Sequence, residues 1–142
     1  GVYSYSQDGG SLQLLTDELS RPNGIAFTPD EKILYVANSD PKNAIWMAYD
    51  VNTDGSIKDG KVFYDATSFV DKEAGLPDGL KVMSNGIIFA TGPGGVWIFN
   101  PSGKVLGKIK TGQATSNCAF GNEGKVVYIT ADMFVMNIVL FS

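Results

Sequence analysis

The sequence predicts an all-β chain of roughly three propeller blades, each a four-stranded antiparallel sheet. Three observations predict it: closely spaced turn signals, short runs rich in Val, Ile, Tyr and Phe between them, and an internal repeat. Apolar residues make up 44% of the chain and charged residues 18%, a balance typical of globular proteins. We therefore expect a single partial propeller domain over residues 1–142.

Turn signals such as Asp54-Gly55, Asn85-Gly86 and Pro101-Ser102-Gly103 divide the chain into short segments with the composition of strands. One stretch, Thr67–Glu73, predicts a single helical turn capped by Thr67 or Ser68. The predicted strands cover about Val2–Ser6, Leu12–Thr16, Gly24–Phe27, Ile33–Asn38, Ala44–Asp50, Lys61–Asp65, Gly79–Met83, Ile87–Thr91, Gly95–Phe99, Lys104–Lys108, Asn117–Phe120, Val126–Thr130 and Val135–Phe141.

The blades are predicted by repetition. Pro22–Phe27, a turn and Ile33–Ala37 align with Pro77–Val82, a turn and Ile87–Thr91, and a third copy runs from Ser116 to Thr130. Asn23 precedes Asp78 by 55 residues and Asp78 precedes Asn117 by 39, spacings close to the roughly 40 to 50 residues of a four-stranded blade.

The alignment places Asn23, Asp78 and Asn117 at one position, where the innermost strand of each blade begins beside the central channel. Carboxylate and amide oxygens on rigid strands suit a hard divalent cation. Pro-Asn-Gly and Pro-Asp-Gly are also strong turn tripeptides, so the pattern alone leaves a purely structural role open.

Several separated segments, in this order and spacing, resemble the later blades of the senescence marker protein / gluconolactonase / luciferin-regenerating enzyme family. These segments are Ser20–Phe27, Leu34–Ala37, Leu76–Gly79 and Thr115–Gly121. The resemblance implies the C-terminal half of a six-bladed propeller with one divalent cation in its channel. It implies Asn23 and Asp78 as cation ligands, with a Glu and a second Asn upstream of Gly1.

The resemblance also implies a metal-dependent hydrolase that opens small sugar-type lactones. A bound cation polarises a ring carbonyl and stabilises the oxyanion that forms. Asp78 is the expected catalytic residue, with cation ligation as its firmer role, and Asn117 is expected to line the channel. Calcium is the first choice of metal, with magnesium, manganese and zinc as alternatives. Organophosphate hydrolysis, seen in related propellers, stays open.

Two further hypotheses stand beside the enzyme. One is a non-catalytic propeller module that binds protein or carbohydrate at its rim. The other is a ring closed by a second copy of this half-propeller. The lack of the upstream Glu and Asn favours an inactive fragment when the chain is alone.

Composition excludes several chemistries for this segment. Because the chain has no histidine, a Ser-His-Asp triad and a His-based zinc site are impossible within it. A net charge of −4 without a basic stripe argues against nucleic-acid binding. No apolar run approaches the roughly 20 residues of a membrane-spanning helix, so no membrane partner is expected, and the compartment stays open.

Three local motifs are interpreted structurally. The segment Asp50–Gly55 resembles half of an EF-hand loop but has Lys61 at the twelfth position, so a polar hairpin loop is expected. The Gly92–Gly95 run lacks the Lys-Ser/Thr ending of a phosphate loop and is expected to be a turn. Strand alternation points Cys118 away from the channel, so we expect a buried thiol rather than a nucleophile.

Overall fold

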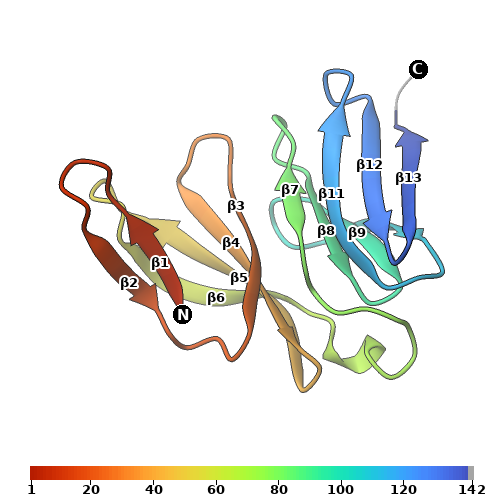
Figure 1. Cartoon of the computed structure of the whole chain (residues 1–142), viewed down its shortest axis with the longest axis horizontal. Coiled ribbons are helices and arrows are strands. Elements are labelled where there is room, and N and C mark those ends of the chain that lie inside the picture. The colour runs from red at the N-terminus through yellow and green to blue at the C-terminus, as the bar shows by residue number, and fades with distance from the viewer. Residues whose placement is uncertain (141–142) are drawn as a thin grey trace.

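The computed structural model describes residues 1–140, and almost all of its regular structure is β-strand (Figure 1). The strands are β1 (Val2–Tyr5), β2 (Leu12–Thr16), β3 (Pro22–Phe27), β4 (Ile33–Asp40), β5 (Asn43–Val51), β6 (Ile57–Asp65), β7 (Leu80–Val82), β8 (Ile88–Gly92), β9 (Gly95–Phe99), β10 (Val105–Lys110), β11 (Thr115–Gly121), β12 (Val126–Ala131) and β13 (Phe134–Val139). The short 3₁₀ turn η1 (Thr67–Phe69) lies in the connection between β6 and β7. The all-β prediction is confirmed.

The strands form antiparallel meanders that fan out side by side as propeller blades do (Figure 1). Two sheets have the predicted four strands, in the orders β3-β4-β5-β6 and β10-β9-β8-β7. Within residues 1–140 the last sheet has three strands, β11-β12-β13, and the first has two, β1-β2. The blade prediction is therefore confirmed, with complete blades in the middle of the chain and partial sheets at its ends.

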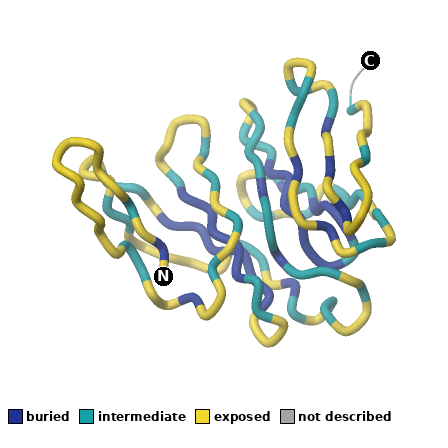
Figure 2. Tube along the Cα trace, in the orientation of Figure 1, coloured by how far each residue is buried: buried dark blue, intermediate teal, exposed yellow. Residues whose placement is uncertain are grey.

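Burial follows from how many neighbours each sheet has (Figure 2). In β4 both faces are covered, because Leu34 and Val36 pack towards the first sheet while Tyr35 and Ala37 pack towards the β7–β10 sheet. In β12 the residues alternate: Val127, Ile129 and Ala131 are buried and those between them are exposed. This period of two is the pattern expected when a sheet is covered on one face.

The strand boundaries differ from the predictions in a few places. Strand β6 begins at Ile57, four residues before the predicted start, and pairs with β5 through register shifts that keep its polar first half in the ladder. Strand β7 has only three residues, since the segment before Leu80 bonds to the neighbouring blade as well as to its own. The predicted last strand reaches Phe141, which lies outside the described residues; β13 ends at Val139.

The predicted helical turn exists as η1, but its capping was predicted wrongly. Ala66 occupies the N-cap position, and no side chain caps the turn. The Thr67 hydroxyl instead accepts a hydrogen bond from the Ala44 backbone N–H at 3.0 Å. It therefore ties the turn to β5 rather than closing its own first turn.

Candidate functional site

The inner strands β3, β7 and β11 lie next to one another, and their hairpin registers show which residues are equivalent. The matching pairs are Ala26 with Tyr35, Lys81 with Phe89, and Ala119 with Tyr128. Counting back three residues from Ala26, Lys81 and Ala119 gives the equivalent residues of the three inner segments. They are Asn23, Asp78 and Ser116. The structure therefore equates Ser116, not Asn117, with Asn23 and Asp78.

Hydroxyl groups on the second strands support this register. Thr91 donates to the Gly79 carbonyl at 2.9 Å, and Thr130 donates to the Asn117 carbonyl at 3.3 Å. Asn117 therefore matches Gly79, one residue beyond the expected position. The sequence alignment missed this position because the third copy lacks the Pro-Asx-Gly tripeptide and has Thr115-Ser116-Asn117 in its place.

The structure brings the Asn23 and Asp78 segments together across the first complete inter-blade interface. A Cβ placed on Gly24 would lie 2.8 Å from the carbonyl carbon of Asp78 and would overlap its carbonyl oxygen. Glycine is thus needed for this close backbone approach. Asn23 is exposed and Asp78 is half-buried, so both reach solvent from neighbouring strands.

Asp78 is held by its backbone and is partly withdrawn from water. Its N–H donates to the Thr91 carbonyl at 3.1 Å, and the next N–H, of Gly79, donates to the Ser116 carbonyl at 2.8 Å. Burial raises the pKa of the Asp78 carboxyl, and a hydrogen bond from the Gly79 backbone opposes that rise. Its charged form is under-solvated, which favours a cationic partner.

Asn117 points its carboxamide oxygen at groups of the protein. That oxygen accepts from the Cys118 N–H at 2.9 Å and from the Lys81 Nζ at 3.3 Å. A Cβ on Gly79 would lie 2.6 Å from the Asn117 Cγ, so the two blades also meet closely here. Its channel-lining role stays a prediction.

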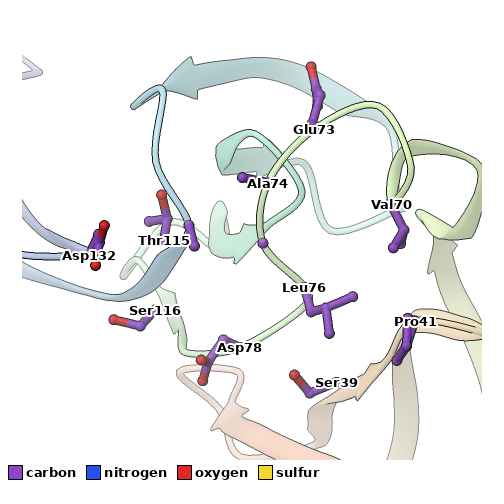
Figure 3. A pocket seen from close by; sticks show the side chains of 12 residues that line it. Ser39, Pro41, Val70, Glu73, Ala74, Leu76, Asp78, Thr115, Ser116 and Asp132 are labelled. Atoms are coloured by element: carbon purple, nitrogen blue, oxygen red, sulfur yellow. The ribbon is translucent and has the colours of Figure 1, made fainter.

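A pocket of about 680 Å³ opens beside Asp78 (Figure 3). Asp78, Ser116 and Asp132 lie on one side of it, whereas Val70 and Pro41 lie on the other. Asn23 and Asn117 do not line this pocket. It therefore presents carboxylate and hydroxyl oxygens on one wall and apolar groups on another, which suits a ring that has both polar and apolar faces.

The interpretations of the three local motifs are confirmed. Asp54 accepts hydrogen bonds from Ser56 within the turn between β5 and β6. The Gly92–Gly95 run is the tight turn between β8 and β9. The Cys118 thiol is 3% exposed, faces the Phe89 carbonyl at 3.6 Å, and has its pKa raised to about 11 by burial. It remains protonated at neutral pH and is a poor nucleophile.

Across residues 1–140, no group of three or more His, Cys, Asp or Glu side chains is arranged to hold a metal ion. The same residues contain no helix long and apolar enough to cross a membrane.

Comparisons with known proteins agree with this architecture. A family model described as the SMP-30/Gluconolactonase/LRE-like region matches residues 1–132. A gluconolactonase of Zymomonas mobilis is 39% identical over an alignment of 142 positions, which covers 97% of this chain and 40% of that protein. The lactonohydrolase oryH of Aspergillus oryzae is 33% identical over 86% of this chain and 30% of its own length.

Among solved structures, a gluconolactonase from Xanthomonas campestris superposes with a TM-score of 0.78 at 34% identity, over 91% of this chain and 40% of that one. The chain thus spans less than half the length of the relatives it matches. The family match, the identities and the blade architecture agree, and the chain belongs to the SMP-30/gluconolactonase/LRE-like family.

Proposed function

We propose that the protein containing this chain is a metal-dependent hydrolase of sugar-type lactones, to which this chain supplies half of the site. The observation that carries the proposal is the contact between the Asn23-Gly24 and Asp78-Gly79 segments at the edge of an open pocket. Membership of a gluconolactonase family supports the reaction class, because relatives at 39% and 34% identity are gluconolactonases.

The donor set fits a hard divalent cation, with calcium first and magnesium, manganese or zinc as alternatives. Asn23, on β3, would supply an amide oxygen and Asp78, just before β7, a carboxylate oxygen, and backbone contacts fix both segments. A bound cation would supply Lewis-acid polarisation of the lactone carbonyl.

The residues of this chain would hold and orient the substrate. Ionised Asp78 is under-solvated in its half-buried position, and an opposite charge nearby would favour its charged form. This makes ligation its firmer role, since a carboxylate so stabilised is a weak base for an attacking water. The Ser116 hydroxyl, 2.9 Å from that of Thr130, provides a hydrogen-bonding group on the same side of the pocket as Asp78.

The test uses Asp78→Ala and Asn23→Ala in the full-length protein. Calcium, magnesium, manganese and zinc are titrated by calorimetry, and lactone opening is followed by acid release. Asp78→Ala should abolish cation binding and hydrolysis, and Asn23→Ala should weaken both.

Asp132→Asn is the matched control, because Asp132 lines the same pocket but belongs to the turn between β12 and β13. Asparagine also tolerates the positive φ of 51° at this position. Retention of both activities by Asp78→Ala would remove Asp78 from the mechanism and favour a non-catalytic propeller.

A further inference from the structure

One wall of the pocket is formed by the loop between η1 and β7. Val70, Glu73, Ala74, Gly75 and Leu76 all line the cavity (Figure 3). This segment has no strand partner of its own, so its position depends on contacts with the blade behind it. The wall can therefore be shaped by residues far from Asp78 in the chain.

The loop is tied to the β7–β10 sheet by an ion pair over an aromatic ring. The Glu73 carboxylate accepts a hydrogen bond from the Lys108 ammonium of β10. The Lys108 Nζ lies 4.2 Å from the Trp97 ring centroid and 5.4 Å from that of Phe69. The two charged side chains are only 14% and 26% exposed, so the pair is screened less than a surface ion pair.

The Gly92–Gly95 turn contacts both the Val70–Leu76 loop and the Glu73–Lys108 ion pair, which together we call the anchor. The Gly94 N–H donates to the Ala74 carbonyl at 2.8 Å. Gly94 has a φ of +84°, and a Cβ at this position would lie 2.7 Å from the Lys108 Nζ and would overlap the Glu73 carboxylate. A side chain here would displace the ion pair, so glycine is required both by backbone conformation and by space.

Asp78 is fixed by different contacts. Its N–H bonds to Thr91, and the Gly79 N–H that follows bonds to the Ser116 carbonyl of the next blade. The buried Thr91 hydroxyl donates to the Gly79 carbonyl at 2.9 Å and lies 3.2 Å from the Ser116 carbonyl. Loosening the loop would therefore leave Asp78 in place.

We propose that Glu73 and Lys108 are positioning residues that set the substrate-binding wall of the pocket through the Val70–Leu76 loop. This inference rests on the proposed lactonase function and adds residues that act on substrate binding rather than on the reacting atoms. Breaking the Glu73–Lys108 ion pair should raise KM and leave kcat unchanged. The reason is that the Val70–Leu76 wall of the pocket moves while the Asp78 segment keeps its hydrogen bonds.

The experiment compares Glu73→Gln and Lys108→Met in the full-length protein with two controls. Asp71→Asn removes an exposed carboxylate from the same loop. Lys108→Arg keeps a cation that can pair with Glu73 and stack on Trp97. The first two variants should raise KM for gluconolactone by about tenfold with kcat within about twofold of the parent. Both controls should keep the parental KM.

Two readouts do not depend on turnover. Hydrogen exchange at residues 70–76 and at the Gly94 amide should quicken in Glu73→Gln and not in Asp71→Asn. Calcium affinity by calorimetry should be unchanged in Glu73→Gln, because the Asp78 segment is held separately.

An unchanged KM in Glu73→Gln, or a joint loss of kcat and calcium binding, would overturn the inference. Neither result would contradict the proposed function, which fails if Asp78→Ala still binds the cation and hydrolyses the lactone. Hydrogen exchange distinguishes failure of this inference from failure of the proposed function. It measures whether the Glu73–Lys108 pair holds the loop, independently of any lactonase activity.

Discussion

The two inter-blade interfaces on either side of the β7–β10 sheet are built differently. Between the β3–β6 and β7–β10 sheets, aromatic rings interlock: Trp46 lies 5.4 Å from Phe99 and 6.1 Å from Trp97, with Tyr35, Phe63, Tyr64 and Phe69 around them. Between the β7–β10 and β11–β13 sheets one aromatic pair, Phe89 and Phe120 at 5.1 Å, is surrounded by smaller side chains. The first interface buries large rings, and the second adds hydrogen bonds.

Those hydrogen bonds lie beside the candidate site. The Ser116 carbonyl accepts from the Gly79 N–H and faces the Thr91 hydroxyl, so β11 is joined to the segment that carries Asp78. Directional bonds set the position of a backbone more narrowly than apolar contact does. We therefore expect the aromatic interface to contribute more to the free energy of unfolding. The hydrogen-bonded interface is expected to fix the position of the backbone that carries Asp78.

The largest effect is expected at the aromatic interface. Trp46→Ala in the full-length protein should reduce the free energy of unfolding by about 3–5 kcal/mol, because Trp46 is 1% exposed and packs against three other rings. Trp46→Phe should cost much less, since the Trp46 Nε1 is buried without a hydrogen-bond partner among the described residues. Urea unfolding followed by circular dichroism measures both. Equal losses would contradict the argument.

The next largest effect on stability compares the two glycines at which neighbouring blades approach closely, Gly24 and Gly79. At Gly24 a new Cβ meets the Asp78 backbone and the Leu80 side chain, 2.9 Å away, so Gly24→Ala should cost about 1–3 kcal/mol. At Gly79 a new Cβ meets the Asn117 carboxamide, which can rotate away, and one backbone atom, the Ser116 carbonyl oxygen at 2.8 Å. Because the backbone overlap at Gly24 is closer and involves two atoms of Asp78, Gly79→Ala should cost less. Unfolding curves test the order, and calcium titration should show the larger loss of affinity in Gly24→Ala. The reverse order would mean that the Asn117 carboxamide and the Ser116 carbonyl cannot move aside.

A smaller effect is expected from the hydroxyl that joins the second interface. Thr91→Val should reduce stability by about 1 kcal/mol, because both carbonyls near the hydroxyl keep a backbone donor. The equivalent Thr130→Val, at an exposed position, should change stability by less than about 0.5 kcal/mol. Exchange of the Gly79 amide should quicken only in the first variant. If the two variants behave alike, the buried hydroxyl does not join the blades.

The smallest effect has the opposite sign. Burial raises the pKa of Asp78, so its ionised form costs stability at every pH above the raised value. With divalent cations removed, Asp78→Asn should melt slightly higher than the parent at pH 7. The difference should shrink as the pH falls below the raised pKa and vanish below the ordinary pKa of an aspartate, where the parental carboxyl is protonated in both the folded and the unfolded state.

The same proton competes with a cation. Calcium affinity of the parent should fall on acidification, beginning at a higher pH than for an ordinary aspartate. Calorimetric titrations from pH 7 downwards measure this. A lower melting temperature of Asp78→Asn at pH 7 would show that the carboxylate is well solvated and stabilising.

The sequence by itself determined the all-β class, the blade repeat and the buried Cys118. These depend on local turn chemistry and on the two-residue alternation of strands, which nearby residues set. It also identified Asn23 and Asp78 as equivalent, because both stand in the same Pro-Asx-Gly tripeptide, and the strand register agrees. Their role as cation ligands remains a prediction.

Only the tertiary structure decided the rest. Ser116 replaced Asn117 at the third equivalent position because the third copy has no Pro-Asx-Gly tripeptide to fix the alignment, so only the strand pairing shows which residues are equivalent. The Glu73–Lys108 anchor joins residues 35 apart, and the need for Gly94 beneath it appears only once a loop and a turn from separate segments meet. Contacts between distant segments depend on how blades pack, and packing is a property of the folded chain as a whole.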